Sequence, residues 1–237
     1  MNFIKTKNIK LYMGNFEKDF KLFAQDHGVS STLMNDYQKV ITSQYIEPYV
    51  MEERQRNIAQ ISVFSRLFME RILFLGTEIN SDVANIINSQ LLYLEMDNPN
   101  KPIHMYINSP GGSVYDGMSI YDVSKFISCP VYTTCIGTAA SMGAVLLASG
   151  EKGNRFALPH SQIMLHSPSG GTGRVTSPDF KIAAKEMEKC ETMLYNVLAE
   201  NMDTDFNTIK EMCDRDFWMT PEEAVKYKVI DSIIQRK

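Results

Sequence analysis

The spacing of apolar residues alternates between two patterns over the first half of the folded region. Short apolar runs predict buried strands at 72–75, 103–107 and 131–136. Between them, apolar residues recur every three to four positions and predict helices at 82–96, 114–127 and 141–148. Strands that alternate with helices at this spacing predict an α/β fold with a parallel sheet and right-handed crossovers.

The remaining pattern predicts further helices at 58–71, 179–202, 208–213 and from Thr220, and strands at 155–158, 162–165 and 229–234. At Thr220, a capping Thr, a Pro at the first helical position and a Glu three residues after the Thr mark the helix start. Residues 1–44 show no sustained period, so we expect an N-terminal extension followed by one domain at 45–237.

The net charge, the hydropathy and the cysteine positions indicate which partners and which cellular compartment to expect. The chain has 237 residues and a formal net charge of -4, which does not suggest a nucleic acid or an anionic membrane as partner. No apolar run is long enough for a membrane span. Four scattered cysteines without a C-x-x-C pair indicate reduced thiols in a cytoplasmic protein, with neither a disulfide frame nor a metal site.

The stretch 137–143 carries a single Ser among small residues, at a predicted junction between strand and helix. Small neighbours let a substrate backbone approach, and the N–H groups that open a helix favour negative charge. Ser141 is therefore a candidate nucleophile. Taken alone, such a stretch is more often a place where a buried helix packs closely against its neighbours.

A serine nucleophile needs a base and an acid to orient that base. Of the four histidines, His166 ends a predicted strand and opens a Gly-rich loop, where sites gather in parallel sheets. Asp216 precedes the bulky residues 217–219, which we expect to exclude water from its carboxylate. Asp214 is a close alternative that these patterns do not separate from Asp216.

The loop 109–113 follows a strand and opens a helix, so it has the geometry to supply a backbone N–H to an oxyanion. Gly112 is the candidate donor there, and Met142, after the nucleophile, is the second. A phosphate-binding loop is a poorer interpretation because no G-x-G-x-x-G or G-x-x-x-x-G-K-[ST] motif is present.

Together these stretches resemble one family. The segments S-P-G-G at 109–112, G-T-A-A-S-M-G at 137–143, L-P-H-S at 158–161, M-L-H-S-P at 164–168 and D-R-D at 214–216 are similar, in this order, to the proteolytic subunits of the ATP-dependent Clp protease (ClpP). The resemblance runs from about residue 46 to the C-terminus. It implies a serine endopeptidase with a crotonase-like α/β head and a protruding handle at about 167–202.

The resemblance also assigns roles. It implies that Ser141 is the nucleophile, His166 the base and Asp216 the orienting acid, and that the N–H groups of Gly112 and Met142 form the oxyanion hole. It further implies that an extended substrate binds along the main chain of the residues that follow Gly112 and open the handle loop, namely Ser113, Val114, Ser169, Gly170 and Gly171.

As partners, the family implies a second copy of the same ring, giving two stacked heptameric rings, and a hexameric AAA+ unfoldase that consumes the ATP, so that the peptidase itself needs no cofactor. The implied docking positions for the unfoldase are Leu92, Tyr106, Phe126, Ile136, Phe156 and Leu158. The extension 1–44 stands at the place of a removable propeptide.

This sequence departs from the family at several positions. His104 and Thr134 are more polar than the docking cleft would suggest, Ser167 replaces a Gln, Ser169 replaces an apolar residue, and 177–178 indicates one extra residue in the handle loop. Two other functions stay open: a catalytically silent subunit of a mixed ring, and a crotonase-type acyl-CoA enzyme, which shares the head fold and needs no Ser-His-Asp set.

Overall fold

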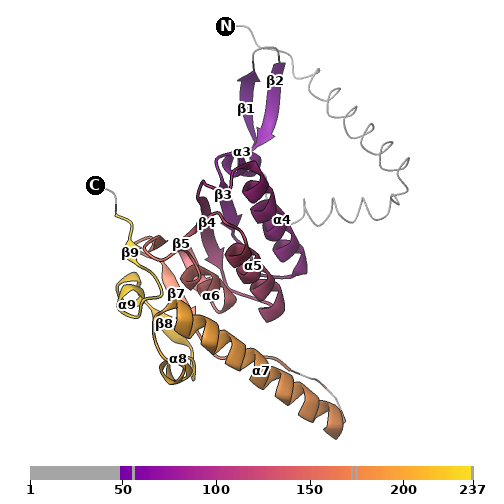
Figure 1. The fold of residues 1–237 in the computed structure, drawn as a ribbon, viewed down its shortest axis with the longest axis vertical. Helices are drawn as coiled ribbons and strands as arrows, with labels where there is room; N and C mark the ends of the chain where they lie inside the picture. Colours follow the sequence, from indigo (N-terminus) through magenta and orange to yellow (C-terminus); the bar gives the residue numbers. More distant parts are fainter. Residues whose placement is uncertain (1–48, 55–56, 172, 174–175, 236–237) are drawn as a thin grey trace. The chain divides into compact units, whose positions relative to one another are not determined.

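A computed structural model describes residues 49–54, 57–171, 173 and 176–235 (Figure 1). The chain divides into two compact units, Met1–Val63 and Phe64–Lys237. The predicted extension and His27 lie outside the described residues, as do Thr172, Arg174 and Val175 of the handle loop.

In the first unit, the described residues form an antiparallel hairpin of β1 (Tyr49–Arg54) and β2 (Asn57–Ser62), with Val50 opposite Ile61. The helix predicted from residue 58 was therefore wrong over its first part, because α3 spans only Val63–Met69. The apolar residues of this segment recur at helical spacing, but pairing of six residues with β1 outweighs that local preference. β-Branched side chains in this segment also favour the strand.

The second unit is built on one sheet. Within the described residues it holds seven strands, of which β3 (Ile72–Leu75), β4 (Ile103–Ser109), β5 (Val131–Ala140), β6 (Arg155–Ala157) and β9 (Ser232–Ile233) lie side by side in this order. β7 (Gln162–Leu165) pairs with β5, and β8 (Phe217–Met219) pairs with β7. All pairings are parallel except that of β7 with β8, so the predicted parallel α/β fold is confirmed.

Three helices pack on the sheet and on one another: α4 (Ser81–Asp97), α5 (Val114–Phe126) and α6 (Met142–Ala148). Alternate side chains of the strands point into this layer, as the alternating burial along β4 shows. The buried residues shared by these elements include Leu73, Leu75, Leu91, Met105, Ile107, Ile120, Cys135 and Leu147.

The C-terminal part contains α7 (Ser177–Asn201), α8 (Phe206–Met212) and α9 (Pro221–Lys226). The predicted capping box is present, since Thr220 caps α9 and Glu223 bonds back to the cap. In α7 the buried residues are Leu194, Tyr195, Leu198 and Asn201, all in its C-terminal third. The N-terminal part of α7 extends away from the rest of its unit (Figure 1), as expected for a handle.

Strand β5 continues four residues beyond its predicted end, through Gly137 to Ala140. It contains a bulge, because it advances from Cys135 to Ala139 while β4 advances only from Ile107 to Ser109. The side chain of Asn108 fills the bulge and accepts the N–H of Thr138 at 3.0 Å. A Cβ on Gly137 would lie 2.5 Å from Asn108 Oδ1, which explains the glycine. The bulge lets β5 pair first with β6 and then with β7.

Two C-terminal strands also differ from the sequence prediction. β8 was not predicted, and β9 covers only two of the six residues expected at 229–234. Among the helices that the structure describes, none combines the length and the apolar character that crossing a membrane requires.

Candidate active site

Ser141 lies on the turn between β5 and α6, where it occupies the N-cap position of the helix. Its backbone has φ 54 and ψ -125, a region that residues with a Cβ rarely adopt. Such a conformation costs about 1–3 kcal/mol and is typical of functional sites. The sharp turn holds the partly buried Ser141 side chain at the end of the strand, as a nucleophile elbow does in serine hydrolases. Ser141 thus has the position of a nucleophile.

The registers of three neighbouring strands bring the candidate triad together. Ala140 on β5 is paired with Met164 on β7, so Ser141 lies next to the end of β7. Leu165, the last residue of β7, is paired with Phe217, the first residue of β8. His166 and Asp216, which follow and precede this pair, therefore face each other, although 50 positions separate them in the chain.

The distances separate the two aspartates that sequence patterns left open. His166 Nδ1 lies 3.9 Å from Asp216 Oδ1, which is an ion-pair distance rather than a hydrogen bond. Asp214 instead approaches Arg215, with 3.8 Å between Oδ2 and Nε, and both of these side chains are exposed. The geometry therefore favours Asp216 as the partner of His166.

The expected shielding of Asp216 is wrong for this chain. The Asp216 side chain is 67% exposed, and the neighbouring Trp218 is 51% exposed. The reason is the alternation of β8, which points Met219 into the core and leaves Trp218 on the outer side.

The loop 109–113 packs directly on the turn that carries Ser141. A Cβ added to Gly111 would lie 2.6 Å from Ser141 Cβ and 3.0 Å from the nitrogen of Met142. Gly111 has φ +95 and Gly112 φ +146, so both positions require glycine. Ser109 holds the loop, since its hydroxyl donates to the Thr77 carbonyl at 2.6 Å and accepts the Gly111 N–H at 3.1 Å.

Among the described residues, two backbone N–H groups at this contact take part in no main-chain hydrogen bond. The loop is bridged to Ile79 through the carbonyl of Gly111 and the N–H of Ser113, so the N–H of Gly112 takes no part in the bridge. Met142 is the first residue of α6, where an N–H has no acceptor within the helix. These are the two donors that the sequence predicted for an oxyanion.

Ser141 and His166 line one small cleft, whose walls are otherwise mainly apolar: Val114, Met142, Val145, Leu165, Pro168, Leu194, Tyr195 and Leu198. In the part of the chain that the structure describes, no hydrogen bond joins the Ser141 hydroxyl to His166. Catalytic contacts often tighten only when substrate binds, so this does not argue against the pair.

Of the predicted substrate-flanking residues, one lines this cleft. Ser113 caps α5 by accepting the Asp116 N–H at 3.4 Å, and Val114 lines the cleft itself. Ser169, Gly170 and Gly171 are exposed and form no strand with other described residues. The added-strand arrangement therefore stays a prediction.

The predicted docking positions are partly gathered on one face of the sheet. Phe74, Tyr106, Thr134 and Phe156 are aligned across β3, β4, β5 and β6. Ile136 follows on the same face of β5. Leu92 on α4, Phe126 at the end of α5 and Leu158 after β6 are exposed, Phe126 by 83%. His104 stands edge-on to Tyr132, and burial lowers its pKa.

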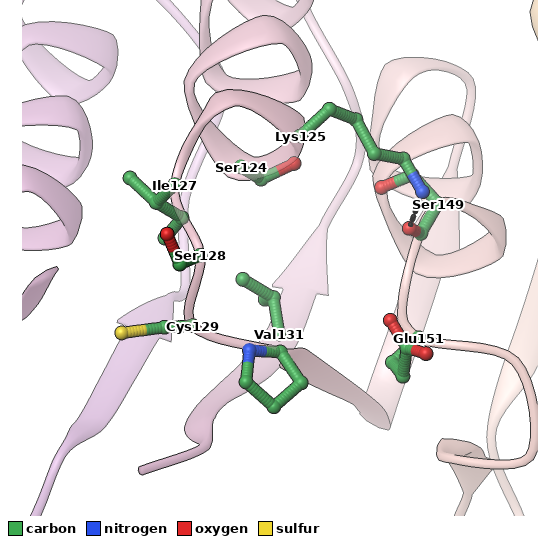
Figure 2. A pocket seen from close by; sticks show the side chains of 9 residues that line it. Ser124, Lys125, Ile127, Ser128, Cys129, Val131, Ser149 and Glu151 are labelled. Carbon is green, nitrogen blue, oxygen red and sulfur yellow. Dashed lines mark hydrogen bonds between the residues drawn. The ribbon is translucent and has the colours of Figure 1, made fainter. Parts of the chain in front are cut away.

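A second cavity, of about 370 Å³, lies at the opposite ends of the strands, between the C-termini of α5 and α6 (Figure 2). Lys125 reaches across it and donates to the Ser149 carbonyl at 2.7 Å. Glu151 also lines it, but no histidine does, so it lacks the pairing of nucleophile and base found at Ser141.

Among the described residues, no group of three or more His, Cys, Asp or Glu side chains is arranged to hold a metal ion. Three of the cysteines are buried, whereas Cys190 is partly exposed.

Sequence reasoning missed a polar cluster at the edge of the active-site cleft. The Tyr195 hydroxyl lies 2.6 Å from Ser167 Oγ and donates to Glu191 Oε1 at 2.9 Å. Tyr195 is 1% exposed, and its burial raises its pKa to about 12. The available signal was a tyrosine inside the buried stripe of α7, between Leu194 and Leu198.

Comparison with known proteins agrees with this geometry. A family model described as Clp protease matches residues 54–237. An ATP-dependent Clp protease proteolytic subunit of Bacteroides thetaiotaomicron is 48% identical over 222 residues, covering 92% of this chain and 99% of that protein. The subunit of Porphyromonas gingivalis is 48% identical over 92% of this chain and 98% of its own length. Subunit 1 of Prochlorococcus marinus is 48% identical, with coverages of 80% and 97%.

Proposed function

The chain belongs to the Clp protease family and is a serine endopeptidase subunit of that protease, and we propose that Ser141, His166 and Asp216 are its catalytic triad. The observation that supports this proposal best is the strand register, which puts all three residues at the adjoining ends of β5, β7 and β8. The strained turn at Ser141 and the 3.9 Å approach of His166 to Asp216 support the same assignment.

In this mechanism His166 takes the hydroxyl proton of Ser141, and the oxygen attacks a peptide carbonyl. The negative charge that develops on the carbonyl oxygen is stabilised by the N–H groups of Gly112 and Met142. His166 then protonates the leaving amine, and a water molecule, activated by the same base, releases the acyl group. Asp216 keeps the imidazole oriented and stabilises its charged form.

The substrate binds as an extended chain. It pairs with the main chain of Ser113 and Val114 on one side and with that of Ser169, Gly170 and Gly171 on the other. Main-chain hydrogen bonds do not read side chains, which suits an enzyme of broad specificity. Hydrolysis by this set of groups uses no cofactor.

For the assembly we propose two stacked heptameric rings, with the exposed part of α7 as the handle between them. A hexameric AAA+ unfoldase of the Clp type docks on the face formed by Tyr106, Ile136 and Phe156, together with Leu92, Phe126 and Leu158, and consumes the ATP. Unfolded chains are then cut inside the rings. The unpaired thiols fit a cytoplasmic location, and residues 1–44 fit a removable propeptide.

The direct test is labelling with a fluorophosphonate probe, which reacts with activated serines. The assembled protein should be labelled at Ser141, and Ser141→Ala should abolish both labelling and peptide cleavage. Ser128→Ala, at an exposed serine beside the second cavity, is the control and should label normally. Absence of labelling in the assembled wild-type protein would favour a silent subunit. Acyl-CoA turnover that survives Ser141→Ala would favour the crotonase-type enzyme.

A further inference from the structure

The segment that carries the base and the segment that carries the acid are tied together on both sides of the His166–Asp216 pair. On one side lies the ladder contact between Leu165 and Phe217. On the other side Ser167 contacts the carbonyl oxygen of Cys213 twice, with its N–H at 2.8 Å and its hydroxyl at 2.9 Å. Because Ser167 directly follows His166, this contact limits how far the two segments separate.

The same hydroxyl reaches the handle helix. Ser167 Oγ lies 2.6 Å from the hydroxyl of Tyr195, which in turn donates to Glu191 one helical turn earlier. Tyr195 has one hydroxyl proton, and the carboxylate of Glu191 is its stronger acceptor. The Tyr195 oxygen is then an acceptor for Ser167. The proton of Ser167 is shared between Tyr195 and Cys213, while the Ser167 N–H keeps the Cys213 contact.

Within this cluster Ser167 and Glu191 are partly buried and Tyr195 is fully buried. The tyrosine is neutral over the working range of a protease, since burial raises the pKa of Tyr195 to about 12. The Tyr195 ring packs edge-on against Phe206 of α8, with 5.6 Å between ring centroids, so its position is set by two helices. An unpaired hydroxyl at such a site is costly, so the three groups form one cooperative unit.

We propose that Ser167 and Tyr195 are positioning residues that hold His166 at the correct separation from Asp216. This inference rests on the proposed function. The pair stands 3.9 Å apart in the free chain, about 1 Å longer than a hydrogen bond, so a small shift of either segment decides whether the imidazole is oriented. A misplacement of about 1 Å is enough to cost on the order of a hundredfold in rate.

The first experiment exchanges Ser167 for two residues of equal shape. Ser167→Thr keeps the hydroxyl, and Ser167→Val replaces it with a methyl group. Rates for a small peptide substrate are measured per active site, after titration with the fluorophosphonate probe. We expect Ser167→Val to lower kcat about tenfold or more with little change in KM, and Ser167→Thr to restore most of it. Equal kcat for the two variants would overturn the proposal.

The second experiment removes only the tyrosine hydroxyl and does not depend on the outcome at position 167. Tyr195→Phe should lower kcat per active site without raising KM, whereas Tyr121→Phe, at a partly buried tyrosine of α5, should not change it. A purely structural role would lower the melting temperature of Tyr195→Phe and leave kcat per site unchanged, and that result would refute the inference. Failure of the proposed function is recognised separately, because the wild-type protein would then not be labelled at all.

Discussion

Ser141 donates its backbone N–H to the carbonyl oxygen of Met164 at 2.9 Å, and this bond continues the ladder between β5 and β7. It fixes the strained turn of Ser141 beside the strand whose next residues are Leu165 and His166. Main-chain pairing therefore fixes the backbone positions of the candidate nucleophile and base. Only the rotamers of the two side chains remain to be set. The acid is held more loosely, since Asp216 is mostly exposed.

Substitutions at the two candidate aspartates, Asp214 and Asp216, should behave differently. Asp216→Asn should lower kcat/KM by about 10⁴-fold because the imidazole loses its orienting carboxylate. Asp214→Asn is the matched control and should retain most activity, since the Asp214 side chain is paired with the exposed Arg215. Peptide cleavage by the assembled variants measures both. A larger loss for Asp214→Asn than for Asp216→Asn would show that the acid is misassigned.

The oxyanion loop should not tolerate a side chain at Gly112. An added Cβ would lie 2.2 Å from the carbonyl oxygen of Ile79, and the positive φ adds strain. We expect Gly112→Ala to lower kcat by at least about a hundredfold, because the N–H aimed at the oxyanion is displaced. Gly153→Ala controls for strain alone, since Gly153 also has positive φ but nothing within 4 Å of an added Cβ. Similar kcat values for the two variants would contradict the assigned donor.

The stability of the fold should fall in acid through Asp231. Burial alone would raise the pKa of Asp231, but hydrogen bonds and charge from the buried Arg155 outweigh it and hold the pKa below its usual value. A lowered folded-state pKa gives stability that is present above the unfolded value, near 4, and is lost as pH falls through the folded value.

Asp231→Asn should therefore cost about 3 kcal/mol at pH 7, because it leaves the Arg155 charge buried without its partner. The difference from wild type should shrink as the pH falls below about 4. Urea unfolding at several pH values measures this. A difference that stays constant from pH 7 to pH 3 would exclude the carboxylate as its source.

Substitution of Phe126 should weaken docking of the unfoldase without lowering the stability of the fold. Its side chain is 83% exposed, so Phe126→Ser should change stability by no more than about 0.5 kcal/mol. If the unfoldase docks there, degradation of a folded substrate with ATP and the cognate unfoldase should fall severalfold, while cleavage of a small peptide stays unchanged. Ile86→Ser, at a 47% exposed apolar residue of α4, is the control for lost surface hydrophobicity. Parallel loss of both activities would point to damage at the active site instead.

Local patterns in the sequence were enough for most of the helices and for the parallel sheet. Apolar periodicity placed α4, α5 and the strands β3 and β4 to within two residues. The secondary-structure prediction failed where strand pairing overrode the local pattern of apolar residues. β2 was taken for helix, and β8 was missed because its three residues become a strand only through pairing with β7.

The sequence by itself determined the chemical groups: one Ser in a small-residue turn, one His at a strand end, two Asp residues downstream and a Gly-rich loop before a helix. These are local signals, set by side-chain size and backbone freedom. Local patterns left Asp214 and Asp216 open, and the family resemblance implied Asp216. Only the tertiary structure shows that Asp216 lies beside His166, and that Ser167, Cys213 and Tyr195 tie their segments together. The first contact follows from the antiparallel pairing of β7 with β8, and the second from the packing of α7 beside the end of β7. Both bring together residues that are too far apart in the chain for a local pattern to relate them.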